Sequence, residues 1–249
     1  MINKIDFSVV IPAYNEAKRL PGFLACLAEH CKQSSSKYEI IVVNDGSLDA
    51  TGGVVRSFMP KFENLRSIES QENRGKGHSV KKGMLAATGD VCLFMDADGS
   101  VSPDEIEQNS HYLSGDGHDI FVGSRAIADG SRTLKISWHR KSAGKLFNFL
   151  VKSFLFKDIE DTQCGFKMFK KACVEPIFSR SRIDGFGFDV EILYLAYKMG
   201  YKVKEGPVSW REAKRSKVRF FLDPLKMFIN ILQIRRFHSG AKWDLKPRR

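Results

Sequence analysis

Residues 93–99 read Leu-Phe-Met-Asp-Ala-Asp-Gly, an apolar run that ends in two carboxylates one residue apart. Side chains at positions i and i+2 of a strand point to the same face, so Asp96 and Asp98 are expected to aim into one cleft just beyond a strand end. Converging carboxylates repel unless a cation lies between them, and Mg²⁺ or Mn²⁺ binds through one or two carboxylates plus substrate phosphates. The stretch predicts a metal-assisted diphosphate site; the alternative is a polar turn that closes a strand.

Apolar β-like runs alternate with helical patterns through the first half of the chain. The expected strands are 7–12, stopped by a proline, then 39–43, 65–68, 90–95 and 119–124, and the expected helices are about 16–33, 49–58, 77–87 and one that begins near 103. Such alternation predicts an α/β fold with a mostly parallel central sheet flanked by helices. In open sheets of this kind, ligands bind beyond the carboxyl ends of the strands.

Polar residues follow four of the expected strands. They lie in segments 12–16 and 44–47, at the two aspartates, and at Arg125. Because the carboxyl ends of parallel strands share one edge, we expect these groups to meet there and to contact a base, a ribose, a metal and a phosphate.

A glycine-rich segment, Asn-Arg-Gly-Lys-Gly-His, covers residues 73–78 before the third expected helix. Two glycines allow backbone N–H groups to approach an anion, a helix N-terminus favours negative charge, and Lys76 is placed to contact a phosphate. The spacing is not that of a P-loop. The alternative is a glycine turn with solvated lysines.

The net charge of +11 is unevenly distributed. Residues 1–131 hold 13 Lys and Arg against 18 Asp and Glu, and residues 132–249 hold 27 against 11, which gives −5 and +16. An acidic half is suited to a nucleotide when a cation is recruited, whereas a basic half attracts phosphates, nucleic acid or an anionic membrane.

The composition, 43% hydrophobic over 249 residues, is that of a globular protein with a sizeable core. No apolar stretch reaches the roughly 18–20 residues of a membrane span, and residues 1–6 do not resemble a secretory signal. The five cysteines show no Cys-x-x-Cys spacing, which favours reduced thiols over disulfides or a zinc cluster. We therefore expect a cytoplasmic protein.

Two apolar stretches with basic flanks lie in the second half, at 145–157 and 219–237. Both are typical of C-terminal amphipathic helices that lie in a membrane interface, where each nearby Lys or Arg adds about 1 kcal/mol of attraction to anionic lipid. They predict peripheral association with the cytoplasmic face of a membrane. The alternative is that both helices cover the sheet as part of the core.

Three motifs together resemble family 2 glycosyltransferases of the GT-A fold, a Rossmann-like architecture: Val-Ile-Pro-Ala-Tyr-Asn-Glu at 10–16, Val-Val-Asn-Asp-Gly-Ser at 42–47 and Asp-Ala-Asp-Gly at 96–99. Segments 123–125, 161–167 and 188–193 resemble the branch that makes polyprenyl-phosphate sugars, and most closely its dolichyl-phosphate β-glucosyltransferases. The resemblance implies one GT-A domain over 1–249, with a nucleotide-sugar-binding half (1–131) and a basic, membrane-proximal acceptor-binding half (132–249).

The resemblance also implies roles for individual residues. It assigns the nucleoside to Pro12, Tyr14, Glu16 and Asp45, the donor diphosphate to Arg211 and Lys217, and the Mg²⁺ or Mn²⁺ ion to Asp96 and Asp98 with Ser100 nearby. It assigns catalysis to Arg125, Asp161 and Asp189, with Glu191 also beside the sugar. Asn44, Asp96 and the Lys76 of the glycine-rich segment complete the expected nucleotide-binding residues. One departure is Asn44, which stands where the family usually has an aspartate.

The implied reaction is an inverting transfer of glucose from UDP-glucose to a polyprenyl phosphate. A phosphate monoester has a second pKa of about 6, so it needs a general base less than an alcohol does, and it needs cations that bring it beside the donor diphosphate. The +16 half supplies such cations. The alternatives are a GDP-mannose-dependent enzyme and a transferase with a protein or polysaccharide acceptor; a nucleic-acid-binding module is disfavoured because no recognition motif is present.

Overall fold

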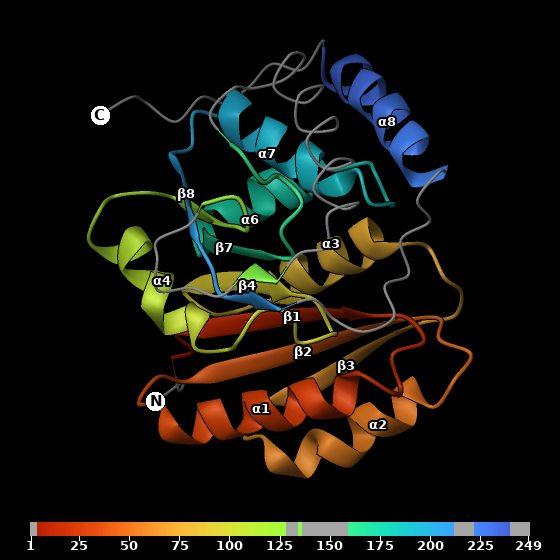
Figure 1. Ribbon diagram of the computed structural model, residues 1–249, viewed down its shortest axis with the longest axis vertical. Coiled ribbons are helices and arrows are strands. Elements are labelled where there is room, and N and C mark those ends of the chain that lie inside the picture. Colours follow the sequence, from red (N-terminus) through yellow and green to blue (C-terminus); the bar gives the residue numbers. More distant parts are fainter. Residues whose placement is uncertain (1–3, 128–133, 136–158, 212–221, 240–249) are drawn as a thin grey trace.

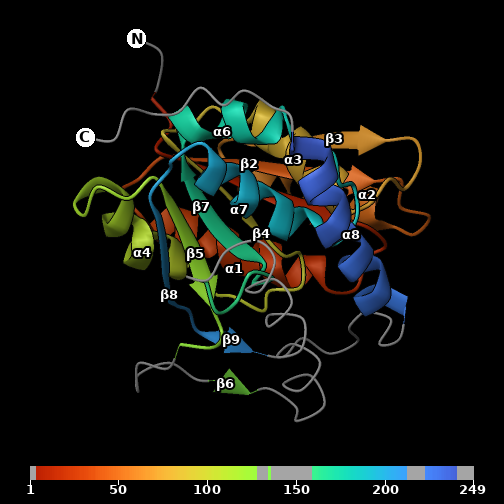
Figure 2. The same cartoon turned by 90° about the horizontal axis from the view of Figure 1, so that it is seen from above.

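The computed structural model describes residues 4–127, 134–135, 159–211 and 222–239, and these form helices packed on both faces of one central sheet (Figure 1). The strands of that sheet are β1 Phe7–Ala13, β2 Tyr38–Asp45, β3 Leu65–Ser70, β4 Val91–Met95, β5 Ile120–Ser124, β7 Phe166–Lys170 and β8 Val203–Pro207. The helices are α1 Leu20–Gln33, α2 Thr51–Phe58, the 3-10 turn η1 Met59–Lys61, α3 Lys76–Ala86, α4 Glu105–Ser114, α6 Lys171–Phe178, α7 Phe188–Lys198 and α8 Leu222–His238. Two further short strands, β6 Leu134–Lys135 and β9 Trp210–Arg211, pair in parallel as a separate ribbon beyond the tips of β5 and β8 (Figure 2).

The sheet runs in the order β3-β2-β1-β4-β7-β5-β8, and only β7 is antiparallel to its neighbours among the described strands. The predicted α/β class, the mostly parallel sheet and the five predicted strands are confirmed. The first strand continues through Pro12 to Ala13, one residue past the predicted stop. Pro12 pairs with Val43 of β2, whereas the β1–β4 ladder has already ended at Val10.

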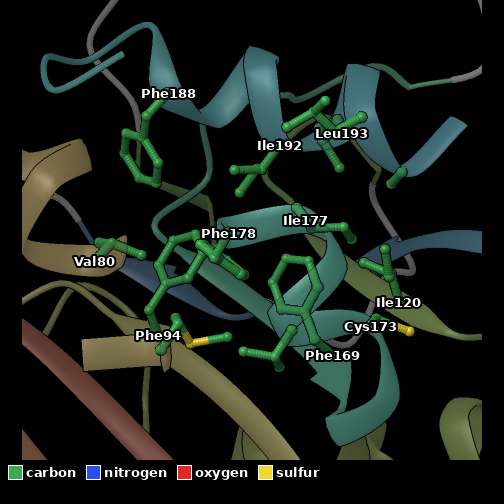
Figure 3. Packing of buried hydrophobic residues seen from close by; sticks show 14 of the residues in the cluster. Val80, Phe94, Ile120, Phe169, Cys173, Ile177, Phe178, Phe188, Ile192 and Leu193 are labelled. Atoms are coloured by element: carbon green, nitrogen blue, oxygen red, sulfur yellow. The ribbon is translucent and has the colours of Figure 1, made fainter. Parts of the chain in front are cut away.

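Each face of the sheet has its own hydrophobic core. Helices α1, α2 and α4 cover one face, and α3, α6 and α7 cover the other (Figure 1). In the second core, Phe94 of β4 and Phe169 of β7 meet Phe178 and Phe188 from the helices above them (Figure 3). The apolar runs of the parallel strands are therefore buried on both sides, as their continuous hydrophobicity predicts.

The helix predicted within 219–237 is present as α8, and the exposed side chains among its described residues include both apolar and basic groups. Ile234 and His238 are buried against the rest of the molecule, whereas Ile229 is 46% exposed and Leu232 is 49% exposed. Within the described ranges, no helix combines the length and the apolar character that crossing a bilayer requires. The other predicted amphipathic helix, 145–157, lies outside the described residues.

Two helical glycines provide a matched test of how closely α3 packs on the sheet. A Cβ atom on Gly83 would overlap Val10 Cγ1 and lie 2.9 Å from Val43 Cγ2, whereas one on Gly53 of α2 would meet nothing within 4 Å. We expect Gly83→Ala to lower the free energy of unfolding by about 1–3 kcal/mol through overpacking. Gly53→Ala should leave it unchanged or raise it by up to about 1 kcal/mol, because alanine favours the helix. Urea denaturation measures both, and equal effects of the two variants would contradict the packing described.

Candidate active site

The carboxyl edge of the sheet collects the segments that follow β1, β2, β4 and β5. Because β7 is antiparallel, the segment before it also reaches this edge, where Phe166 pairs with Met95. The ribbon strand β9 joins the same region, since the Arg211 backbone N–H donates to the Ser100 carbonyl at 2.9 Å. The prediction that the polar segments after the strands share one edge is confirmed.

The two aspartates lie in the turn after β4 rather than on the strand, which ends at Met95. The Gly99 N–H donates to the Asp96 carbonyl at 3.4 Å, and Gly99 has a φ of 67°, a left-handed conformation that suits glycine. Asp98 Oδ1 accepts from the Ser100 hydroxyl at 2.6 Å and from its backbone N–H at 3.0 Å. The turn therefore sets the direction of both carboxylates, and strand alternation, the predicted reason, does not.

Two basic side chains face these carboxylates. Lys76 Nζ lies 2.5 Å from Asp96 Oδ1, and Arg19 Nη1 lies 3.4 Å from Asp98 Oδ2. Arg19 is in turn held by Glu16, whose Oε2 accepts from its Nε at 2.6 Å. Burial alone lowers the pKa of Lys76, but the charge of Asp96 and of the nearby Asp189 outweighs it and leaves that pKa raised. Lys76 is therefore a permanent cation at this edge.

A buried ion pair lies behind Lys76. Lys167 Nζ, on β7, is 2.5 Å from Asp189 Oδ1, on the first turn of α7, and it also donates to the Cys164 carbonyl at 2.8 Å. The side chains are 0% and 4% exposed. Burial raises the pKa of Asp189, and Lys167 and Lys76 offset this shift only in part. Lys167 thus keeps a carboxylate in a place from which water is excluded.

Gly165 lets the segment before β7 approach Asp96. A Cβ atom at this position would overlap Asp96 Oδ2 and lie 2.8 Å from Oδ1. A larger residue at this position would therefore displace the Asp96 carboxylate from its place. The contact brings the 161–165 segment beside the carboxylate predicted to bind a metal.

Arg125 and Asp161, both predicted as catalytic residues, form a bidentate pair. Asp161 accepts from Arg125 Nε at 2.7 Å, from Nη2 at 2.8 Å and from its backbone N–H at 3.0 Å. Arg125 also lies over the ring of Trp210, 5.7 Å from its centroid, and 31% of its side chain stays exposed. Burial alone raises the pKa of Asp161, yet Arg125 reverses the shift and leaves it lowered. Asp161 therefore orients a cation and is a poor proton acceptor.

Asp45, predicted to contact a nucleoside, is 2% exposed and holds the glycine-rich segment. Its carboxylate accepts from Asn73 Nδ2 at 3.0 Å, from the Arg74 N–H at 3.2 Å and from the Gly75 N–H at 2.8 Å. Asn44 donates to Glu69 at 2.6 Å and accepts from the Ser47 N–H at 3.3 Å. Both side chains are therefore engaged in fixing neighbouring loops.

The glycine-rich segment does not offer the predicted backbone cradle for an anion. The Asp184 carbonyl accepts from the Gly77 N–H at 2.7 Å and from the His78 N–H at 3.2 Å, so it caps α3. A Cβ atom on Gly75 would lie 2.5 Å from the same carbonyl oxygen, and one on Gly77 would overlap the Ile183 oxygen. These glycines permit close packing against residues 183–184, and the Lys76 side chain remains as the group that can meet a phosphate.

The remaining predicted residues lie at the same edge, with one exception. Pro12 is buried near the end of β1, Tyr14 is half-buried just after it, and Glu16 is buried in its pair with Arg19. Arg211 is exposed on β9. Lys217 lies outside the described residues.

Three residues of the site were not predicted: Arg19, Lys167 and Glu205, which accepts from the Glu160 and Asp161 backbone N–H groups at 2.8 Å each. Arg19 has a local signal, because it lies three residues after Glu16 on a helical turn. The sequence around Lys167 gives no such signal, because a lysine within a strand is expected to face solvent unless its partner on a distant helix is known.

The donor set at the edge fits a hard divalent cation. Five carboxylates (Glu16, Asp96, Asp98, Asp161 and Asp189) face four basic groups (Arg19, Lys76, Arg125 and Lys167), which leaves an excess negative charge where a diphosphate is expected. Within the described residues, no group of three His, Cys, Asp or Glu side chains could hold a metal alone. Two carboxylates with further oxygens from a diphosphate match how Mg²⁺ and Mn²⁺ usually bind.

The Lys167–Asp189 pair gives a test of this charge arrangement that does not depend on activity. We expect Lys167→Met to lower the free energy of unfolding by about 3–5 kcal/mol, because it leaves a buried carboxylate unpaired. The loss should grow between pH 5 and pH 8, since a protonated Asp189, favoured at low pH, needs no cationic partner. Lys167→Met/Asp189→Asn should recover much of the stability and remove the pH dependence. Lys170→Met, on the same strand, is the control in urea denaturation, and a pH-independent loss in Lys167→Met would contradict the pairing.

Known proteins resemble this chain along nearly its whole length. The chain is 36% identical to a dolichyl-phosphate β-glucosyltransferase of Dictyostelium discoideum, over 98% of this chain and 78% of that protein. The enzyme of the same name from Drosophila melanogaster is 38% identical over 97% and 78%, and that from Homo sapiens is 34% identical over 98% and 79%.

Solved structures share the fold at lower identity. Glucosyl-3-phosphoglycerate synthase from Mycobacterium tuberculosis, in complex with Mn²⁺, UDP and phosphoglyceric acid, superposes with a TM-score of 0.69 at 16% identity, over 96% of this chain and 80% of that one. Mannosyl-3-phosphoglycerate synthase from Rubrobacter xylanophilus gives 0.68 at 16% identity, over 98% and 78%. This likeness establishes the GT-A architecture.

The sequence model of the family described as "Glycosyl transferase family 2" matches residues 8–178, a range that spans the carboxyl-edge segments from β1 to α6. With relatives above 30% identity along nearly the whole chain, this match confirms the resemblance drawn from the three sequence motifs. The chain therefore belongs to glycosyl transferase family 2 and is a glycosyltransferase.

Proposed function

We propose that this chain transfers glucose from UDP-glucose to a dolichyl-type polyprenyl phosphate and gives a β-linked lipid-phosphate sugar. The observation that carries the proposal is the identity, along nearly the full chain, to enzymes named for this activity. The site geometry supports it, because an edge that holds both carboxylates and fixed cations suits two phosphate-bearing substrates.

The proposal places the donor on the strand ends of the half 1–131. Pro12, near the end of β1, and Tyr14 and Glu16, just after it, lie where a nucleoside would bind, and Asn44 and Asp45 shape the neighbouring loops. Lys76 and Arg211 are the cations within reach of the diphosphate, with Lys217 proposed from the sequence alone. Lys76 is the best placed of these, because its Nζ already lies 2.5 Å from Asp96 Oδ1 at this edge.

Asp96 and Asp98 are the residues proposed to hold Mg²⁺ or Mn²⁺. The bound ion would supply Lewis-acid stabilisation of the charge that grows on the leaving diphosphate. Ser100 keeps Asp98 in place by its two donated hydrogen bonds, and Gly165 leaves room for Asp96. Lys76 adds a fixed positive charge to the same region, where charge-assisted hydrogen bonds are strong.

The acceptor side belongs to the half 132–249, together with Arg125. A phosphate monoester is mostly dianionic at pH 7, so the enzyme must hold it rather than deprotonate it. Arg125 is oriented for this by Asp161 and Trp210, and part of its side chain remains exposed. Asp189 is proposed to lie near the sugar, where a carboxylate stabilises an oxocarbenium-like transition state.

A polyprenyl phosphate is a membrane lipid, and we propose peripheral association with the cytoplasmic face of a membrane through α8. Ile229 and Leu232 expose apolar surface on this helix, and Arg235 and Arg236 are exposed on its last turn. This pairing of apolar and basic groups suits an anionic bilayer. None of the five cysteines, all within the described residues, forms a disulfide, which is consistent with a reducing compartment.

Transfer of radiolabelled sugar to a short prenyl phosphate tests the proposed function. We expect label from UDP-glucose and not from GDP-mannose to enter the lipid fraction, and EDTA to stop the reaction. Asp98→Asn should lower kcat by about 100-fold or more, because electrostatic stabilisation of the leaving group is lost. Asp116→Asn, which changes an exposed aspartate after α4, is the control. Transfer from GDP-mannose alone, or full turnover of Asp98→Asn in EDTA, would overturn the assignment.

Sedimentation with vesicles that contain anionic lipid tests the role of α8. Leu232→Asp and Ile229→Asp should each weaken partitioning by about tenfold, the factor that corresponds to a loss of about 1.4 kcal/mol of apolar burial. Leu48→Asp is the matched control, since Leu48 is 89% exposed but lies between β2 and α2. A loss of binding in the Leu48 variant and none in the α8 variants would place the membrane surface elsewhere.

A further inference from the structure

Glu191 is fully buried on α7, yet its contacts are not with the ion pairs of the site. Its two carboxylate oxygens accept from the Arg182 backbone N–H at 2.9 and 3.0 Å, and one of them accepts from the Ile183 N–H at 2.9 Å. A further contact, at 2.8 Å, joins it to His238 Nε2. A carboxylate with this many donors acts as a fixed anchor for the backbone around it.

The 182–184 backbone, which Glu191 holds, is the segment against which the first turn of α3 packs. The Asp184 carbonyl caps the Gly77 and His78 N–H groups, at 2.7 and 3.2 Å. A Cβ atom on either Gly75 or Gly77 would collide with the carbonyl oxygens of residues 183–184. Because the two segments pack this closely, a shift of the 182–184 backbone must move the first turn of α3.

Lys76 is the first residue of that turn and lies between the two glycines. Its neighbour Gly75 is held on the other side by Asp45, whose carboxylate accepts the Gly75 N–H at 2.8 Å. Lys76 Nζ can lie 2.5 Å from Asp96 only while this turn keeps its place. Glu191 thus influences the donor side of the site indirectly, through the 182–184 loop and the first turn of α3.

The same carboxylate also binds the end of α8. His238 is 4% exposed and is the last residue of the helix, whose Ile234 is likewise buried in the core. Near its middle, α8 touches the start of α7, since a Cβ atom on Gly187 would overlap Asn230. Helix α8, which exposes Ile229 and Leu232, is therefore bound to the same 182–184 segment against which α3 packs.

We propose that Glu191 is a positioning residue for donor binding. By fixing the 182–184 backbone, it sets the position of the first turn of α3 and therefore the position of Lys76 beside Asp96. Through its contact with His238, it also holds the end of α8 against the same backbone. The inference rests on the proposed function for its substrate and on the contacts of Glu191 for its mechanism. It replaces the expectation, drawn from the family resemblance, that this carboxylate stands beside the sugar.

Glu191→Gln tests the proposal, because an amide side chain keeps the size of the carboxylate but can no longer accept all four contacts. We expect KM for UDP-glucose to rise about tenfold while kcat stays within about threefold of the wild type. Amide hydrogen exchange should accelerate at Gly77 and His78 and stay unchanged in α1, a pattern that a general loss of stability would not give. Glu175→Gln, an exposed glutamate on α6, should change neither readout.

Three outcomes would overturn the proposal. These are a fall in kcat with KM unchanged, which would put Glu191 beside the sugar; unchanged kinetics; and exchange that accelerates equally in α1 and α3. Should Glu191→Gln fail to fold, His238→Leu, which removes one contact of the four, is measured in its place with the same expected direction. If the wild-type chain does not turn over UDP-glucose, the proposed function fails, and the exchange measurement still decides the role of Glu191.

Discussion

Charge balance at the carboxyl edge of the sheet is the constraint on which the site depends. Acidic and basic side chains stand there within hydrogen-bond distance of each other, and the pair Lys167–Asp189 is almost entirely shielded from water. Burying either ion alone would cost several kcal/mol, so each requires the other. The partly exposed pair Lys76–Asp96 lies in front of it, where a substrate can rearrange the contacts. The inner pair is thus the more rigid of the two, and the outer pair is the more accessible to solvent and to ligands.

Glycine makes this density of charge possible. Gly165 leaves space for the Asp96 carboxylate, and Gly77 leaves space for the carbonyl oxygens that cap α3. In both places a methyl group would occupy the position of an oxygen atom, so the requirement is for close approach and does not arise from an unusual backbone angle. The glycine-rich segment at the start of α3, whose backbone was predicted to approach an anion, allows two parts of the chain that are far apart in sequence to pack closely.

The sequence predicted the fold well wherever the signal is local. Apolar runs that end in polar residues located β1, β2, β4 and β5, and a parallel arrangement then required their ends to meet. The insertion of β7 between β4 and β5 was not predicted, because pairing of distant strands leaves no periodic trace in either segment. For the same reason the sequence could name Arg125 and Asp161 but could not show that they bind each other, and it gave no indication that Lys167 is buried. The backbone N–H groups at the start of α3 were predicted to approach an anion, but Gly77 and His78 donate instead to a carbonyl more than a hundred residues away, a contact that the local sequence does not indicate.

The pairing of Arg125 with Asp161 bears on the kind of acceptor that this edge can serve. An alcohol acceptor needs a carboxylate free to take a proton, and its pKa should approach the working pH. Asp161 is the opposite, with both oxygens bound to a guanidinium and a lowered pKa. The same pairing fixes a cation that is partly exposed and stacked on Trp210, which is what a dianionic phosphate requires. The geometry therefore favours a nucleophile that arrives already ionised, and the enzyme's task becomes one of holding two like-charged substrates together.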